Sequence, residues 1–276
     1  MRVFLAASRR DPAGLRIAEW LIKHYGVKTG EEEFTLRLSS ECTLKLVGCE
    51  IVYTPGSTIP ADTDLAIFLS RHSGRSPPVL STHVTGNFGE ASLGGESGKL
   101  SMAPASKMKL FLMEASRLAE GIGYEAAFEC THHGPTLDCP VMFAEVGSRL
   151  ENWTDWKAAS AVGEAVVYAL EERRSFRAAV AFGGPHINRR YTKAMVEGEL
   201  AIGHAMSKHY THLISYSLVE YCIKRTLEPV STAIIEWKGM RGAERRRLLE
   251  ALSKLKIPYT RASELGGRLE AGGGQA

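Results

Sequence analysis

The chain has 276 residues, of which 44% are hydrophobic and 24% charged, as in a globular protein with one large α/β domain or two small ones. It lacks any run of about 18 apolar residues, so we expect no membrane-spanning helix, and its N-terminus becomes polar too early for a secretory signal. The five cysteines are odd in number and form no CxxC pair, which favours a reducing, cytoplasmic location over a disulfide framework.

The net charge of +3 does not indicate a kind of binding partner, but the charged residues are unevenly distributed along the chain. Residues 236–261 contain eight Lys or Arg against three Glu, a local excess of +5. A basic face of this kind can bind phosphate backbones, and a solvated helix face has the same composition.

The chain begins with an apolar strand at residues 1–8, followed by a turn and a helix. Asp11 before Pro12 favours a helix start, because the carboxylate caps backbone N–H groups and proline fits the first helical position. Apolar residues at helical spacing continue this helix to Gly26. Ligands tend to bind where a strand of an open sheet runs into its helix, so Ser8 either lines a site or only caps the helix.

The rest of the chain alternates apolar strands with amphipathic helices. The further strands are expected at 34–38, 43–47, 64–70, 79–85, 124–131, 142–148, 177–182 and 230–237. The further helices are expected at 104–120, 152–172, 192–204, 216–227 and 242–255. We therefore predict an α/β fold with a mixed, largely parallel central sheet flanked by helices, forming a single domain over 1–265 with a flexible tail at 266–276.

Histidines lie in or just after four of the expected strands, each beside a Gly, Pro or Ser turn. They are His72, His83, the pair His132 and His133, and His186. Because the carboxyl ends of parallel strands lie at one edge of a sheet, we expect these imidazoles to converge there.

The segment from Glu129 to His133 holds two of these histidines in succession. On a regular strand Glu129, Thr131 and His133 share one side, while His132 faces the other. Either the two histidines serve different roles, or the strand ends at Thr131 and the following turn re-aims them.

Two kinds of chemistry fit this set of side chains. With Glu129 and Glu145, the histidines could hold a metal through imidazole nitrogens and a carboxylate. They could equally supply a general base and an oxyanion donor without metal. The sequence contains no HExxH motif, no zinc-finger spacing, no GxSxG elbow and no nucleotide-binding fingerprint. Cys130 could be a nucleophile, but a buried inert thiol is the simpler interpretation.

Five segments in this order resemble the archaeal and plant type of D-aminoacyl-tRNA deacylase. They are residues 69–73, 83–87, 129–136, 145–148 and 183–186. The resemblance runs from about Ser8 to about His212, and the string Thr-His-His-Gly-Pro-Thr with a downstream Gly-Gly-x-His is its specific part. The chain departs from the family at Cys130, where an alanine is usual, and at Ile187, where a tyrosine is usual.

The resemblance implies hydrolysis of the ester between a D-amino acid and the 3′ end of tRNA, which frees both and serves chiral proofreading. It also implies zinc, up to two ions per chain, and a fold similar to phosphorylases and peptidyl-tRNA hydrolases. The implied catalytic residues are His83, Glu129, Thr131, His132 and His133. The implied substrate-binding residues are Ser8, Arg71, His72, Asn87, Thr136, Gly183 and Gly184. The implied metal ligands are His72, His83, Glu129, His133 and His186.

The expected partner is D-aminoacyl-tRNA, with residues 236–261 contacting the tRNA, and neither membrane nor DNA. A monomer is favoured, and the sequence also allows an oligomer. The alternative is a nucleoside phosphorylase-like enzyme or a non-catalytic RNA-binding protein. A purely binding module would show basic residues and stacking aromatics more than carboxylates.

Overall fold

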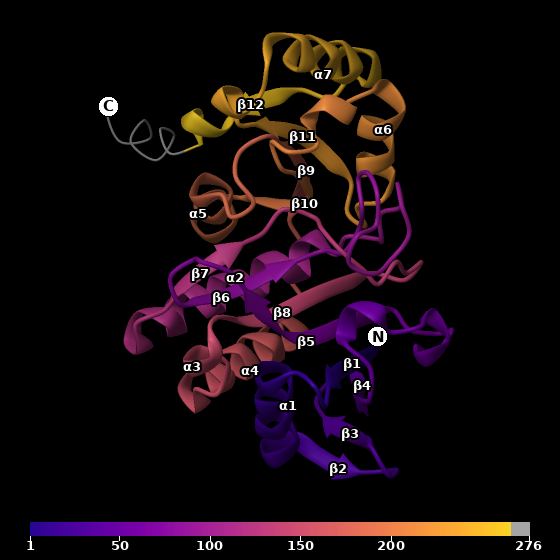
Figure 1. Ribbon diagram of the computed structural model, residues 1–276, viewed down its shortest axis with the longest axis vertical. Helices are drawn as coiled ribbons and strands as arrows, with labels where there is room; N and C mark the ends of the chain where they lie inside the picture. Colours follow the sequence, from indigo (N-terminus) through magenta and orange to yellow (C-terminus); the bar gives the residue numbers. More distant parts are fainter. Residues whose placement is uncertain (266–276) are drawn as a thin grey trace, which may run out of the picture.

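The computed structural model describes residues 1–265, which form two β-sheets joined by helices (Figure 1). The larger sheet has eight strands in the order β2-β3-β4-β1-β5-β8-β6-β7, and the smaller has four in the order β10-β9-β11-β12. Strands of the larger sheet are β1 (Arg2–Ser8), β2 (Gly26–Lys28), β3 (Glu33–Arg37), β4 (Glu41–Val47), β5 (Leu65–Ser73), β6 (Val79–His83), β7 (Glu125–Phe128) and β8 (Val141–Ser148). Those of the smaller sheet are β9 (Arg177–Phe182), β10 (Leu200–Met206), β11 (Val230–Ile235) and β12 (Tyr259–Arg261).

The strand directions confirm the mixed, largely parallel α/β class. Strands β4, β1, β5 and β8 run parallel to one another, and the smaller sheet is parallel throughout. Antiparallel pairs join β2 to β3, β3 to β4, and β6 to β8. Because β6 and β7 are parallel to each other, both run opposite to β5 and β8.

Helices cover both sheets and fill the space between them. They are α1 (Pro12–Tyr25), α2 (Ala105–Ala119), α3 (Leu150–Trp153), α4 (Trp156–Glu171), α5 (Arg189–Glu197), α6 (Tyr216–Lys224) and α7 (Gly242–Leu255). Helix α2 contacts β6 and β7 of the larger sheet and β10 of the smaller one, while α6 and α7 pack together on the far side of the smaller sheet (Figure 1).

The small sheet is buried on both faces, as its alternating side chains show. Val180 and Phe182 of β9 pack with α6 and α7, whereas Ala179 and Ala181 join the core of the larger sheet. The single domain expected over 1–265 stays a prediction, and the tail expected at 266–276 lies outside the described residues. Within 1–265, no helix combines the length and apolar character needed to cross a membrane.

Several expected elements differ from those observed. The helix expected at 192–204 is wrong in its second half: α5 ends at Glu197, Gly198 follows, and β10 begins at Leu200. Strand β10 is buried on both faces, so its apolar run has no period that separates strand from helix. The helix expected at 152–172 is two helices, because Asp155 caps a fresh start of α4.

Candidate active site

The site lies across one face of the larger sheet, where β5, β8 and β6 are neighbours. Glu145 of β8 is opposite both Ser70 of β5 and Ser81 of β6, so the three side chains point to the same face. His72 is paired with Gly147 and His83 with Phe143 in the same registers. The expected convergence at one sheet edge is therefore wrong in its geometry, because β6 runs opposite to β5 and delivers its histidine to the middle of the face.

A glycine in β8, Gly147, leaves room for the imidazole of His72. A Cβ on Gly147 would lie 2.6 Å from Cβ of His72, so a larger residue there would displace that imidazole. At the other end of the face, the ring of Phe143 stacks on His83 with centroids 4.8 Å apart. The space beside Gly147 and the stacking on Phe143 fix the imidazoles of His72 and His83 over the sheet.

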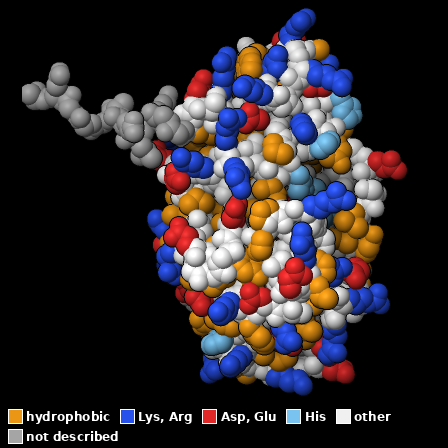
Figure 2. Space-filling view, turned by 60° about the vertical axis from the view of Figure 1, so that its left-hand side comes forward, with side chains coloured by type: hydrophobic (Ala, Val, Ile, Leu, Met, Phe, Trp, Pro, Cys, Tyr) orange, Lys and Arg blue, Asp and Glu red, His pale blue; other side chains and the backbone are white. Residues whose placement is uncertain are grey.

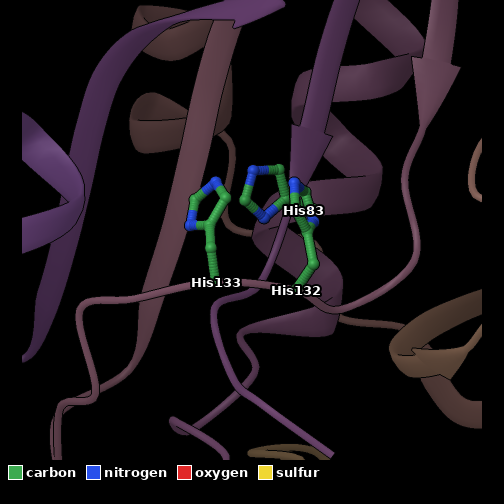
Figure 3. Close-up of side chains that lie close together, drawn as sticks. All are labelled: His83, His132 and His133. Atoms are coloured by element: carbon green, nitrogen blue, oxygen red, sulfur yellow. The ribbon is translucent and has the colours of Figure 1, made fainter. Parts of the chain in front are cut away.

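A turn after β7 brings the two adjacent histidines to the same place. Strand β7 ends at Phe128, and His133 takes a left-handed backbone conformation with φ of 40°, which breaks the strand alternation. The ring centroids of His132 and His133 lie 4.1 and 4.8 Å from that of His83 (Figure 3). Of the two alternatives left open by the sequence, the turn that re-aims both histidines is correct, although the strand ends earlier than Thr131.

Glu129 is the centre of the cluster and is completely buried. Its Oε2 lies 2.8 Å from Nε2 of His186, and its Oε1 lies 3.0 Å from Nδ1 of His72 without a well-aligned hydrogen bond. Burial by itself raises the pKa of Glu129, but the contacts with these two imidazoles lower it well below the usual value. Burial alone lowers the pKa of His72, and the contact with Glu129 reverses this and raises it. We infer an ionised carboxylate paired with a protonated His72.

Glu145 lies close to Glu129, but its pKa is shifted in the opposite direction. Its Oε2 is 3.8 Å from Nε2 of His83 and 3.9 Å from Nδ1 of His72. Burial and the charge of Glu129 raise the pKa of Glu145 well above its usual value. The pKa values of the two neighbouring carboxyl groups are thus shifted in opposite directions, because two buried like charges repel each other.

The three histidines of Figure 3 are neutral, and their rings are tilted against one another, with interplanar angles of 42° between His83 and His132, 87° between His83 and His133 and 67° between His132 and His133. Burial and the neighbouring His133 lower the pKa of His83 to about 3, and burial lowers that of His133 to about 4. Burial and the imidazoles around it lower the pKa of His132 well below its usual value. In each ring Nδ1 faces a backbone carbonyl oxygen, at 3.3, 2.9 and 2.7 Å for His83, His132 and His133. Nδ1 therefore carries the proton, and Nε2 keeps a free lone pair.

These lone pairs make the cluster suitable for a metal ion. Three overlapping groups have ligand atoms within 4.8 Å of one another: His83, His132 and His133; Glu129, His132 and His186; and His72, Glu129 and Glu145. Nε2 of His83 and Oε1 of Glu129 are buried without a hydrogen-bond partner among residues 1–265, which is costly unless something else binds them. The donor set of imidazole nitrogens and a carboxylate is the one that zinc prefers.

The proposed substrate-binding residues fall into different places. Asn87 and Thr136 hold the glycine-rich loop at 94–98 against the histidine turn: Asn87 Nδ2 donates to the Gly94 carbonyl at 3.0 Å, and Thr136 Oγ1 accepts from the Glu96 N–H at 2.9 Å. These two therefore shape the wall of the site next to His133.

Ser8 and Arg71 belong to a second polar group at the start of α1. Ser8 donates to the Cys49 carbonyl at 2.7 Å, and Arg71 contacts Glu50 at 3.2 Å and Asp11 at 3.9 Å. Strand alternation turns Arg71 away from its neighbour His72. The structure does not bring Ser8 or Arg71 into the histidine cluster.

Gly183 and Gly184 carry His186 to Glu129. Both have positive φ, 90° and 85°, which permits the sharp turn after β9. The turn is anchored because the N–H of Cys130 donates to the carbonyl of His186 at 2.9 Å. Burial raises the pKa of the Cys130 thiol, which supports an inert thiol over a nucleophile.

Sequence reasoning missed His204, which supports the site from β10. It is buried, and its Nδ1 lies 3.1 Å from Oγ1 of Thr131. It was placed in the second half of the helix expected at 192–204, where the structure has strand β10, so its place inside an apolar strand was not recognised.

Comparisons with known proteins agree on one family. The family model described as D-aminoacyl-tRNA deacylase matches residues 59–260. A D-aminoacyl-tRNA deacylase of Korarchaeum cryptofilum is 40% identical over 96% of this chain and 94% of its own, and one of Thermococcus kodakarensis is 34% identical over 91% and 96%. A crystal structure described as a conserved protein of unknown function superimposes with a TM-score of 0.86, covering 96% of each chain at 25% identity. The chain belongs to the D-aminoacyl-tRNA deacylase family.

Proposed function

We propose that this protein hydrolyses the ester bond of D-aminoacyl-tRNA at the histidine and carboxylate cluster, which releases the D-amino acid and free tRNA. The family supports the reaction, and the observation that carries the site is Glu129, buried and in contact with His72 and His186. The phosphorylase-like and purely RNA-binding alternatives have no comparable support.

His132 is the proposed general base. Its ring is close to both His83 and His186, with centroids 4.1 and 4.3 Å away, so it connects the two halves of the cluster. It is neutral, its side chain is 26% exposed, and its Nε2 lies 3.9 Å from Oε2 of Glu129. A neutral imidazole open to solvent can take a proton from the attacking water and return it to the leaving ribose oxygen.

Zinc is the proposed cofactor, with His83, His133, Glu129 and His186 as the residues that would hold one or two ions. When bound, zinc would polarise the ester carbonyl and lower the pKa of a water molecule. His72 was also expected as a ligand, but its contact with Glu129 and its raised pKa suit a protonated side chain that orients the carboxylate.

The proposed partner surface includes residues 236–261, in a cytoplasmic monomer without DNA or membrane partners. Not all of this basic charge is available to tRNA. Arg245 donates to the carbonyl of Trp237 at 3.0 Å, and Arg247 donates to those of Ile214 and His212 at 3.1 Å. Lys238, Arg246 and Lys254 are exposed.

A deacylation assay tests the proposed function. The purified protein is incubated with one tRNA esterified with the D or the L form of the same amino acid, and release of amino acid is followed. We expect rapid release of the D form alone. Absence of release from the D ester by metal-loaded protein would refute the proposal.

A further inference from the structure

A basic cleft lies directly behind the turn that carries His186. Its volume is about 1050 Å³, and its walls are the outer side of β7, the first turns of α5 and the turn at 184–188. A second cleft of about 620 Å³ adjoins it and shares Lys208, Lys238 and Gly239 with it. No site histidine lines either cleft, so the larger cleft is separate from the reacting groups, and the turn at 184–188 is the wall between them.

The N-terminus of α5 lies at the wall of this cleft, and its capping residue carries a buried donor. Asn188 caps the helix, because its Oδ1 accepts from the N–H of Arg190 at 3.0 Å. The side chain is 3% exposed, and its Nδ2 has no hydrogen-bond partner among residues 1–265. A buried amide donor at the positive end of a helix dipole is matched by an anionic oxygen.

Glycines keep the wall of the cleft thin. A Cβ on Gly184 would lie 2.3 Å from Nδ2 of Asn188, and one on Gly239 would lie 2.3 Å from the nitrogen of Gly184. The backbones of the segments at 183–184 and at 239 thus meet at this point, and the side-chain amide of Asn188 packs against them beside the His186 turn.

The charges that line the cleft favour an anion. Its basic residues are Arg189, Arg190, Lys193, Lys208 and Lys238, and its acidic ones are Glu125, Glu197 and Glu236. The acids are neutralised: Arg189 lies 3.3 Å from Glu125, Arg190 lies 2.7 Å from Glu236, and Lys193 lies 3.6 Å from Glu197.

Two basic residues of the cleft remain uncommitted. Lys208 and Lys238 are exposed, and neither has a carboxylate within 4.0 Å in the described chain. Figure 2 shows Lys and Arg side chains spread over the face in view, with several histidines among them in its upper half. The cleft therefore offers two free ammonium groups beside the unpaired amide.

We propose that this cleft is a phosphate subsite, in which Asn188, Lys208 and Lys238 hold a phosphodiester of the single-stranded acceptor end of the tRNA. The inference rests on the proposed function and adds the part of the substrate that is bound behind His186. Asn188 lies two positions after His186, which faces Glu129, so a bound phosphate would set the position of the ester on the other side of the turn.

The test compares two substrates, a D-aminoacyl-tRNA and the same D-amino acid esterified to adenosine, which has no phosphate. The readout is kcat/KM for the tRNA ester divided by kcat/KM for the adenosine ester. We expect the double variant Lys208→Ala, Lys238→Ala to lower this ratio about tenfold or more, because charge-assisted hydrogen bonds to phosphate are lost. The salt dependence of KM for the tRNA is expected to weaken, by roughly 0.7 in log–log slope for each lost contact.

The variant Asn188→Asp tests the side-chain amide of Asn188 directly. Aspartate caps a helix as well as asparagine does, and the melting temperature is measured for both proteins, so that any cost of burying the carboxylate is separated from an effect on the substrate. The new carboxylate would repel the phosphate, so the ratio of kcat/KM for the tRNA ester to that for the adenosine ester is expected to fall. Lys157→Ala on α4 and Lys254→Ala on α7 remove exposed lysines outside the cleft and are the matched controls.

The outcomes separate this inference from the proposed function. If the wild type cleaves neither ester, the proposed function itself fails. If it cleaves both, and Asn188→Asp and the double lysine variant keep the wild-type ratio, the subsite is refuted while the function stands. Inorganic phosphate is expected to compete only weakly, and its consumption with cleavage of a nucleoside would also refute the subsite, because the cleft would then hold a free phosphate substrate.

Discussion

Thr131 and His204 connect the turn of the active site to the smaller sheet. Oγ1 of Thr131 lies 3.1 Å from Nδ1 of His204 and accepts from the N–H of Ala205 at 3.2 Å. Nε2 of His204 lies 3.0 and 3.1 Å from the carbonyl oxygens of Ser101 and Arg225, so it carries the proton, and the hydroxyl donates to Nδ1. Thr131 was expected to be catalytic, but these contacts make it a positioning residue for the adjacent His132.

Thr131→Val should test this role. The change keeps the shape of the side chain but leaves Nδ1 of a buried histidine without a donor, which costs about 1–3 kcal/mol of stability. We expect a lower free energy of unfolding in urea and a lower kcat, both restored in Thr131→Ser. Wild-type values for the valine variant would show that the contact does not support the site.

The pH dependence of stability follows from the same histidine. Burial lowers the pKa of His204 from 6.5 to about 4, so between these values the unfolded chain binds a proton that the native chain does not. Stability is therefore complete above pH 6.5 and falls as the pH drops toward 4. We expect His204→Gln to reduce this slope by up to one proton, about 1.4 kcal/mol per pH unit. Urea unfolding at several pH values measures it, and an unchanged slope would contradict the buried neutral state.

Glu129→Gln should remove most of the activity. The amide is isosteric but carries no charge, so it cannot pair with the protonated His72 or serve as an anionic ligand. We expect kcat/KM to fall by roughly 10²-fold or more, the range for a positioned acid–base group. Glu151→Gln on α3, which changes an exposed carboxylate, is the matched control. Near-normal turnover by the Glu129 variant would remove it from the mechanism.

Zinc content can be measured directly by elemental mass spectrometry. We expect zinc in the native protein, less in His83→Ala and in His133→Ala, and a lower melting temperature after chelation, because a ligand that binds only the native state stabilises it. Cys130→Ala, which restores the residue usual in the family, is expected to keep both zinc and activity. Full activity after verified removal of metal would exclude zinc from the reaction.

The glycine-rich loop offers a matched pair of substitutions. Gly95 and Gly98 both have positive φ, 75° and 68°, so alanine strains either position by about 1 kcal/mol. A Cβ on Gly95 would lie 2.9 Å from side-chain atoms of both Asn87 and Thr136, whereas one on Gly98 would meet nothing within 4 Å. We therefore expect Gly95→Ala alone to lower kcat/KM, through displacement of the His133 turn. Equal effects at both positions would point to backbone strain only.

The sequence was sufficient to find the five clustered histidines, but not the supporting His204, and it did not show how the five are arranged. Each imidazole stands beside a turn at the end of an apolar run, which is a local feature. The direction of β6 is not local, although one sign of it exists: only residues 74–78 join β5 to β6, too few for the crossover that parallel strands need. Strand β10 could not be recognised, since a run buried on both faces has the same pattern in a strand and in a helix.

The turn that carries His186 has a consequence for how the protein is made. Glu129 and His186 are 57 positions apart, and Thr131 and His204 are 73 apart. A nascent chain that has emerged only as far as β8 contains His83, Glu129 and His133 but neither of these later partners. Contacts of such long sequence separation form late, since loop closure must precede them. We therefore expect the site to be assembled only after β10 has been synthesised, so a chain that ends before β10 would have no working deacylase centre to act on tRNA.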